Sequence, residues 1–220
     1  MSEISQLTLT TPRTARIALL GDFSPETTDV WLVTHGYRQL GASFVSKFRS
    51  IAAPHRVIVA PEGLSRFYIE GFSGRVGASW MTREDREYEI EDQFNYLERV
   101  YDLITQACTP VRIHLLGFSQ GVATAWRWLA RTGQPVHSFT VWAGGIPPEQ
   151  PPALVTRLEQ IPFVGVYATQ DEFITEAQAL ELLQARQVTW PHLHILRFEG
   201  RHDLDGPTLV QLAGIAEGGK

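Results

Sequence analysis

The sequence predicts a single α/β domain over residues 1–220, with a mostly parallel central sheet that helices flank on both faces. Three observations predict this class. Short apolar segments rich in β-branched residues alternate with longer amphipathic segments, as strands joined by crossover helices do. Several short segments, such as "RVIVA" at 56–60, are apolar at every position, which is typical of strands covered on both faces. The length of 220 residues is that of one domain, and we find no linker or internal repeat.

The strands and helices are expected in a regular order. The apolar segments predict seven strands, at 15–20, 30–35, 56–61, 111–117, 139–144, 163–169 and 193–198. The segments between them predict helices at about 40–52, 84–107, 120–132, 151–160, 175–187 and 206–216. The helix at 84–107 shows its period most clearly, because apolar residues recur at steps of three and four from Ile90 to Ile104. In "GGIPPEQPP", Pro151 or Pro152 is expected in the first turn of the next helix.

One longer segment, "EGLSRFYIEGFSGRVGASWM" at 62–81, has no clean period. It combines several glycines with aromatic residues and fits neither a strand pattern nor a helix pattern. We therefore expect a long loop here. Loops of this length in compact domains are usually functional or mobile.

Composition and charge exclude several classes of function. A hydrophobic content of 44% and a charged content of 20% are those of a soluble globular protein. The net charge of −5 and the isoelectric point near 5.8 provide no basic surface for nucleic acid. The single Cys108 excludes a disulfide framework and a thiolate-rich metal site. We find no signal-peptide pattern and no apolar run of membrane-spanning length, so we expect a cytoplasmic protein without integral membrane association.

The pentad "GFSQG" puts Ser119 between two glycines, directly after an expected strand and before an expected helix. A sharp turn in this context raises a serine hydroxyl clear of the sheet, and Gly117 and Gly121 are needed where side chains would collide with their neighbours. The backbone N–H of Gln120 would then lie at a helix N-terminus, where it can stabilise an oxyanion. The alternative is a serine-containing turn without chemistry.

A serine nucleophile needs a base, and the base needs an acid that holds its tautomer. In this kind of sheet these groups follow later strands, in the chain order serine, acid, histidine. Asp171 follows the sixth expected strand, and His202 follows the last one. The competitors fit less well, because His114 and His194 fall inside expected strands and Glu172 is expected to point elsewhere.

A second oxyanion donor is expected from the loop after an early strand. The tetrapeptide "THGY" supplies that loop, and Gly36 allows the backbone to turn sharply toward the nucleophile. The backbone N–H of Tyr37 is the candidate donor, beside that of Gln120. We interpret His35 as a residue that braces this loop, because it precedes the serine and lacks a second ligand at metal-binding spacing.

Taken together, "THGY", "GFSQG", "TQDEF" and "GRH", in this order, resemble the α/β-hydrolase superfamily. The pentad is similar to that of the phospholipase/carboxylesterase branch, which includes acyl-protein thioesterases. The resemblance covers nearly the whole chain and implies an α/β-hydrolase fold without a large cap domain. It implies Ser119 as nucleophile, His202 as base and Asp171 as acid, with the amides of Tyr37 and Gln120 as the oxyanion hole.

The resemblance also implies that 62–81 is a lid-like segment that lines an acyl pocket. Aromatic residues of this segment and beside the serine and the acid are expected to form an apolar substrate-binding pocket: Phe67, Tyr68, Phe72, Trp80, Phe118 and Phe173. The alternative is that most of them are core residues, Phe118 and Trp80 in particular.

The expected activity is hydrolysis of carboxylic esters with small to medium acyl groups through an acyl-enzyme, without a metal or an organic cofactor. Thioesterase or lysophospholipase chemistry on the same triad is an alternative. A non-catalytic protein of the same fold that binds a ligand is another. The expected partner is a small-molecule or lipid ester substrate and no nucleic acid. The sequence leaves both a monomer and a homodimer as alternatives, because it singles out no helix face as a contact between copies.

Overall fold

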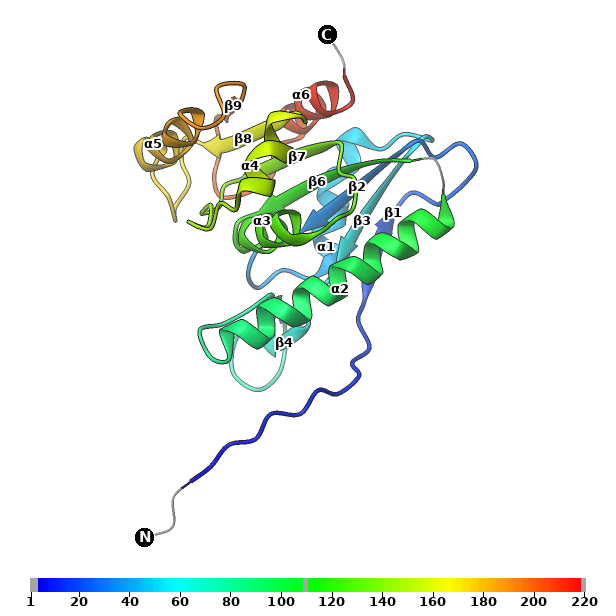
Figure 1. Cartoon of the computed structure of the whole chain (residues 1–220), viewed down its shortest axis with the longest axis vertical. Helices are drawn as coiled ribbons and strands as arrows, with labels where there is room; N and C mark the ends of the chain where they lie inside the picture. The colour runs from blue at the N-terminus through cyan, green and yellow to red at the C-terminus, as the bar shows by residue number, and fades with distance from the viewer. Residues whose placement is uncertain (1–3, 109–110, 219–220) are drawn as a thin grey trace.

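The computed structural model describes residues 4–108 and 111–218, and its centre is a seven-stranded sheet of order β1-β3-β2-β6-β7-β8-β9 (Figure 1). The strands are β1 (Ile17–Leu20), β2 (Asp29–Thr34), β3 (Arg56–Pro61), β6 (Arg112–Phe118), β7 (Ser138–Trp142), β8 (Phe163–Ala168) and β9 (His194–Phe198). β1 pairs with β3 in the antiparallel sense, whereas the other neighbouring pairs of this sheet are parallel. The prediction of a mostly parallel α/β sheet is therefore confirmed.

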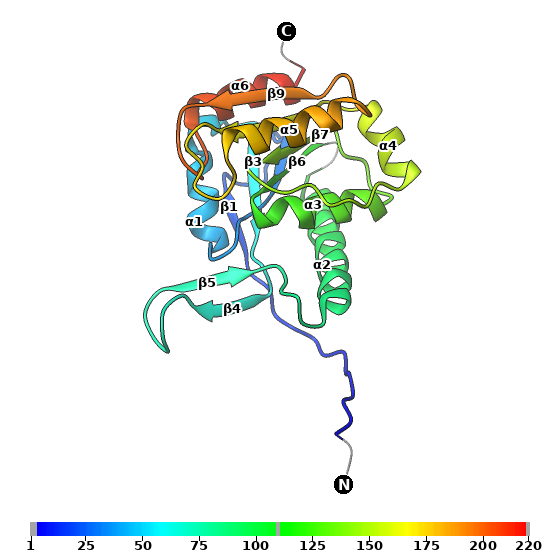
Figure 2. The same ribbon diagram turned by 90° about the vertical axis from the view of Figure 1, so that its left-hand side faces the viewer.

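Helices cover both faces of this sheet (Figures 1 and 2). They are α1 (Gly41–Val45) with the 3₁₀ helix η1 (Ser46–Ile51), α2 (Arg86–Ala107), α3 (Gln120–Arg131), α4 (Pro152–Glu159), α5 (Glu176–Gln187) and α6 (Gly206–Ala216). One hydrophobic cluster packs the sheet against α2 to α5 and includes Val100, Trp126 and Leu183. A second packs it against α1, η1 and α6 and includes Phe48 and Leu209. In the described part of the chain, no helix is both long and apolar enough to cross a membrane.

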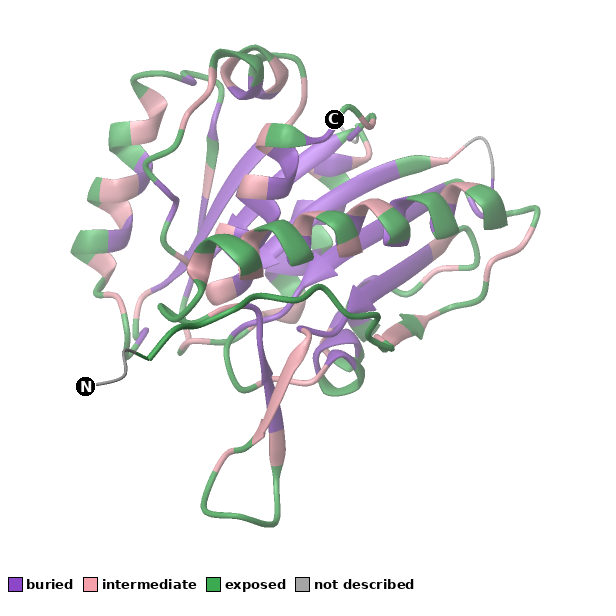
Figure 3. Cartoon of the chain, turned by 60° about the horizontal axis from the view of Figure 1, so that its bottom comes forward, coloured by how far each residue is buried: buried purple, intermediate pink, exposed green. Residues whose placement is uncertain are grey.

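The central strands are apolar throughout because their side chains serve the two clusters alternately. In β2, Val30 and Leu32 pack into the first cluster, whereas Trp31 and Val33 pack into the second. Side chains on successive residues of a strand point to opposite faces, and here helices cover each face. The five inner strands are accordingly buried along most of their length (Figure 3), whereas the edge strands β1 and β9 are more exposed.

Residues 62–81 differ from the expected loop, because they contain a two-stranded antiparallel hairpin outside the main sheet (Figure 2). Its strands are β4 (Ser65–Tyr68) and β5 (Val76–Ser79), and its exposed turn projects from the domain (Figure 3). Apart from Val76, the second strand is built from small residues with little strand propensity, so its sequence carries only a weak strand signal. Gly77 is needed there, since a Cβ on it would lie 2.6 Å from the carbonyl oxygen of Arg38.

The parallel strands end at one edge of the sheet, and this edge gathers the predicted site residues. His35 follows β2, Ser119 follows β6, Asp171 comes shortly after β8, and His202 comes shortly after β9. Side chains that follow parallel strands collect at the carboxyl edge of an open α/β sheet, where ligands usually bind.

Candidate active site

Ser119 lies at the sharp turn between β6 and α3, with a φ of 53° and a ψ of −120°. An L-residue rarely adopts this conformation, so the backbone is strained at the serine. Both flanking glycines lack room for a side chain. A Cβ on Gly117 would lie 2.6 Å from the Cα of Val122, and one on Gly121 would collide with the carbonyl oxygen of Thr34. The predicted need for glycine at these two positions therefore has a steric cause.

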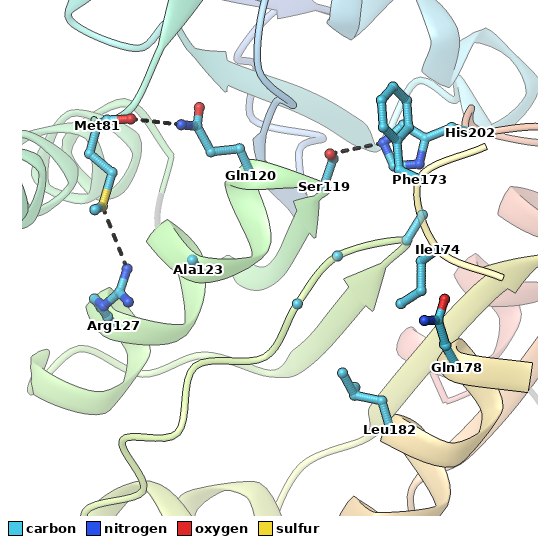
Figure 4. A pocket seen from close by; sticks show the side chains of 13 residues that line it. Met81, Ser119, Gln120, Ala123, Arg127, Phe173, Ile174, Gln178, Leu182 and His202 are labelled. Carbon is cyan, nitrogen blue, oxygen red and sulfur yellow. Dashed lines mark hydrogen bonds between the residues drawn. The ribbon is translucent and has the colours of Figure 1, made fainter. Parts of the chain in front are cut away.

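Three side chains, each from a separate loop, meet at this turn: those of Ser119, His202 and Asp171. The Oγ of Ser119 lies 2.8 Å from Nε2 of His202 (Figure 4), and Nδ1 of His202 lies 2.6 Å from Oδ2 of Asp171. With a neutral imidazole, Nδ1–H donates to the carboxylate, and Nε2 accepts a hydrogen bond from the serine hydroxyl. In this tautomer the histidine is placed to remove the serine proton.

Backbone N–H groups that follow Asp171 in its own loop hold its carboxylate in place. Its Oδ1 accepts hydrogen bonds from the backbone N–H groups of Phe173, at 2.8 Å, and Ile174, at 3.2 Å. This leaves Oδ2 for His202. The carboxylate side chain is only 1% exposed, so its hydrogen bonds replace those that water would make.

His202 is fixed by ring contacts and by its backbone. Its imidazole centroid lies 5.0 Å from the ring of Phe118 and 4.7 Å from that of Phe173. Its backbone N–H donates to a carboxylate oxygen of Glu172 at 3.1 Å, and this hydrogen bond lowers the pKa of Glu172. Glu172 does not bond the imidazole, in keeping with the interpretation from the sequence. Its contact with the His202 backbone has no sequence signal.

Two backbone N–H groups beside the serine are free of protein acceptors. Those of Tyr37 and Gln120 donate no hydrogen bond within residues 4–108 and 111–218. Gln120 is the first residue of α3, where an N–H has no intrahelical acceptor. The loop before Tyr37 lies against the turn, since a Cβ on Gly36 would be 3.1 Å from the Cβ of Ser119. Both N–H groups thus remain available to a ligand.

His35 braces the loop that carries Tyr37. Its Nε2 accepts a hydrogen bond from the N–H of Gly63 at 2.9 Å, and its Nδ1–H donates to the carbonyl of Gly36 at 2.8 Å. The indole N–H of Trp80 donates to the carbonyl of His35 at 2.8 Å. Burial lowers the pKa of His35, which favours the neutral imidazole that these bonds require. These contacts agree with the bracing role interpreted from the sequence.

The side chain of Gln120 fastens the end of the hairpin to the start of α3. Its amide donates to the carbonyl of Met81 at 2.9 Å (Figure 4) and to Oγ of Ser79 at 3.1 Å. Its Oε1 accepts from the N–H of Trp80 at 3.1 Å. The sequence predicts a role for the backbone of Gln120 but none for its side chain.

A cavity of about 680 Å³ opens beside Ser119 and His202, between α3 and α5 (Figure 4). It lies over the loop that follows β7. The lining residues are Met81, Ser119, Gln120, Ala123, Arg127, Ala143, Gly144, Gly145, Phe173, Ile174, Gln178, Leu182 and His202. Most of the lining is apolar or small, as is usual for sites that bind small molecules.

Of the six aromatic residues expected in the substrate pocket, Phe173 alone lines this cavity. Phe118 and Trp80 are 1% and 2% exposed and pack in the interior. They are therefore core residues, which is the alternative interpretation from the sequence. The other three belong to the hairpin segment: Phe67 stacks on the ring of Tyr37, Tyr68 is half-exposed, and Phe72 is almost fully exposed. The geometry therefore gives these five no contact with the cavity.

Another group of polar side chains lies where the parallel strands begin. Among the described residues, Asp29, His114 and Glu217 form the one group whose ligand atoms, within 4.8 Å of one another, are spaced for a metal ion. Both carboxylates already have cationic partners, because Arg56 contacts Glu217 at 2.7 Å and Arg112 contacts Asp29 at 2.9 Å. Cations at this distance oppose binding of a metal, so we interpret the group as an ion-pair network.

Comparison of the sequence with protein-family models and with curated proteins found no match. Comparison with solved structures found the same fold in acyl-protein thioesterase 2 from Zea mays, at 15% identity and a TM-score of 0.67, over 92% of this chain and 100% of that one. Esterase PE8 matches at 19% identity and a TM-score of 0.65, over 92% and 100%. A phospholipase/carboxylesterase from Dyadobacter fermentans matches at 13% identity and a TM-score of 0.60, over 93% and 97%.

Two of these structures, the acyl-protein thioesterase and the phospholipase/carboxylesterase, carry names of the branch that the sequence motifs resemble. The likeness of all three covers 92% to 93% of this chain, whose sheet is mostly parallel with helices on both faces. The chain therefore has the α/β-hydrolase fold, and residues 4–108 and 111–218 include no large cap domain.

Proposed function

We propose that this protein is a serine hydrolase that cleaves carboxylic esters through an acyl-enzyme, with Ser119 as nucleophile, His202 as general base and Asp171 as its partner. The observation that carries the proposal is the continuous hydrogen-bonded chain Ser119 Oγ, His202 and Asp171, at 2.8 Å and 2.6 Å, which opens on a cavity. The strained serine backbone supports it, because such strain gathers at functional sites.

In the proposed reaction, His202 removes the hydroxyl proton of Ser119 while Oγ attacks the ester carbonyl. The N–H groups of Tyr37 and Gln120 stabilise the resulting oxyanion, and each such donor contributes about 3 kcal/mol. His202 then protonates the leaving alcohol, which departs and leaves the acyl group on Ser119. A water molecule repeats the sequence on the acyl-enzyme and releases the acid, while Asp171 stabilises the imidazolium.

The proposed substrates are esters with small to medium acyl groups. The cavity volume supports this, since about 680 Å³ lies within the range of sites for small molecules. Thioesters and lysophospholipids react by the same steps, and neighbours in fold include a thioesterase and a phospholipase/carboxylesterase. In this proposal the hairpin at 62–81 is a lid-like segment, attached to the site through Gln120.

The first experiment compares wild type and Ser119→Ala on p-nitrophenyl esters of increasing acyl length. We expect kcat/KM to peak at a short or medium chain and to fall roughly 10³- to 10⁶-fold in the variant, because the nucleophile is lost. Circular dichroism checks that the variant is folded.

Each outcome of this experiment has a distinct meaning. A peak at long chains would favour a lipid or acyl-protein substrate. Wild-type turnover in a folded Ser119→Ala protein would contradict the proposed nucleophile. Absence of turnover by the wild type at every length would favour a ligand-binding protein of this fold.

A further inference from the structure

The cavity beside Ser119 extends along one face of α3 to Arg127. Ser119, Ala123 and Arg127 are spaced by four residues, so they lie in one row along the helix and all three line the cavity. Eight residues correspond to about 12 Å along the helix axis. Helical side chains lean toward the N-terminus, and Figure 4 shows the guanidinium directed toward the sulfur of Met81, whose carbonyl contacts Gln120 at the start of α3.

Arg127 has no good hydrogen-bond acceptor within the described residues. Its side chain is only 16% exposed, yet its one hydrogen bond is a weak contact of 3.7 Å with the sulfur of Met81. The nearest carboxylate oxygen, on Glu149, lies 3.8 Å away, and Arg86 shares that half-exposed carboxylate at 3.6 Å. A guanidinium removed from water without matched acceptors is costly, because five N–H donors need partners.

Two other arginines of this chain, Arg131 and Arg66, are paired much more closely. Arg131, on the next turn of the same helix, donates to Glu91 at 2.7 Å, and Arg66 donates to Glu62 at 2.6 Å. Burial lowers the pKa of Arg127, and the nearby Arg86 lowers it too, whereas Glu149 and Glu87 oppose this shift. Arg127 therefore differs from its neighbours in lacking an acceptor at hydrogen-bond distance.

The rest of the cavity provides no negative charge for this guanidinium. The lining contains no aspartate, glutamate or lysine, and Arg127 is its one arginine. Between Arg127 and the serine the lining includes Ala123, Met81 and the neutral amide of Gln120. A partly desolvated cation whose nearest carboxylate oxygen lies 3.8 Å away, in a cavity whose lining is otherwise neutral, attracts an anionic group.

We infer that the cavity selects ester substrates that carry a carboxylate several atoms from the scissile ester, with Arg127 as the specificity-determining residue for that carboxylate. The inference rests on the proposed esterase function. A planar guanidinium bonds a carboxylate through two parallel hydrogen bonds, which fixes the orientation of the substrate as well as its charge. The half-ester of a linear dicarboxylic acid has this chemistry.

The test uses mono-p-nitrophenyl esters of linear dicarboxylic acids, from succinic to suberic acid, each beside its neutral methyl-capped counterpart. The measured quantity is the ratio of kcat/KM for the charged ester to that for the neutral ester. We expect this ratio to favour the charged ester at one chain length. Arg127→Met lowers the ratio roughly 10- to 100-fold there, as loss of a hydrogen-bonded ion pair implies. Arg127→Lys keeps part of the preference.

Arg131→Met is the matched control, because it removes an arginine of the same helix that pairs with Glu91 and does not line the cavity. It leaves the ratio unchanged. If Arg127→Met fails to fold, the charged-to-neutral ratio of kcat/KM is measured for the wild type at about 0.01 M and at about 1 M salt. Salt screens the ion pair, so the ratio falls at the higher concentration.

A ratio that neither Arg127→Met nor salt changes would overturn the inference while Ser119-dependent hydrolysis stands. If neither ester is hydrolysed in a Ser119-dependent manner, the proposed function fails instead. The two failures are distinguishable because the neutral esters report on the serine alone.

Discussion

The described part of the chain holds two constellations in which a serine, a histidine and an aspartate are joined by hydrogen bonds. They are Ser119–His202–Asp171, at the carboxyl ends of the parallel strands, and Ser138–His114–Asp29, at or near their amino ends. The second repeats the first with the two imidazole nitrogens exchanged. Its aspartate contacts Nε2 at 2.8 Å, and its serine contacts Nδ1 at 2.8 Å.

The surroundings of the two constellations differ more than their geometry. Ser138, His114 and Asp29 are at most 1% exposed, whereas Ser119 and His202 line an open cavity. Ser138 begins a regular strand, and it is not among the residues with a positive φ, as Ser119 is. A hydrogen-bonded triad is therefore not enough for a nucleophile. Access, a strained turn and unpaired N–H groups for an oxyanion distinguish the proposed catalytic set from a structural one.

The two histidines should separate activity from stability most clearly. His202→Ala lowers kcat/KM by about 10⁴-fold or more, because the serine loses its base, and leaves the fold intact. His114→Asn keeps turnover but lowers the free energy of unfolding by about 3 kcal/mol, because a buried hydrogen-bonded partner of Asp29 is lost. Ester hydrolysis and urea unfolding measure the two effects. A folded His114 variant as inactive as the His202 variant would contradict the distinction.

The two aspartates give the next largest contrast. Asp171→Asn lowers kcat about 10⁴-fold, since the amide no longer favours the tautomer in which Nε2 accepts the serine proton. Steady-state kinetics on the preferred p-nitrophenyl ester measure this loss. An unchanged rate would assign the acid to another carboxylate, and Asp203 would be tested next, although in the structure it pairs with Lys47.

Asp29 instead links stability to pH. Burial by itself raises its pKa, but hydrogen bonds from His114, Thr28 and Arg112 outweigh burial and hold the pKa well below its usual range. With a lowered pKa in the folded state, the ionised carboxylate stabilises the fold above the unfolded value of about 3.9, and this contribution is lost as the pH falls below it.

Asp29→Asn therefore lowers the free energy of unfolding by about 3 kcal/mol at neutral pH. The difference from wild type shrinks as the pH falls below about 3.9. Urea unfolding across this pH range measures it. A difference that stays constant down to the acid limit would show that the charge of Asp29 is not what stabilises this end of the sheet.

Periodicity along the chain predicts the seven strands of the sheet and the loops that carry Ser119, Asp171 and His202, because these features are local. It does not predict the strand order or the antiparallel β1, which depend on pairing between distant residues. The hairpin at 62–81 escapes prediction because small residues such as Gly77 and Ala78 form its second strand.

The second constellation has no sequence signal. Asp29, His114 and Ser138 lie in ordinary strands, and only the parallel register brings them together: His114 is the partner of Ser138 across β6 and β7. The sequence also gives no signal for Arg127, because there it is one charged residue of an amphipathic helix. Its place in the row with Ser119 follows from the helical period, but its missing acceptor depends on the fold around it.

The two serines themselves provide the smallest and sharpest contrast, through substitution by glycine. Ser119 has a φ of 53°, a region that glycine adopts without steric cost, so Ser119→Gly relieves strain and raises the free energy of unfolding by about 1 kcal/mol while turnover is lost. Ser138→Gly lowers it by about 1 to 3 kcal/mol, because the ring of His114 loses a buried hydrogen-bond partner and a strand gains a glycine. Thermal and urea unfolding measure both. Equal destabilisation by the two substitutions would mean that the turn at Ser119 stores no strain, and the backbone would no longer distinguish the proposed nucleophile from its buried counterpart.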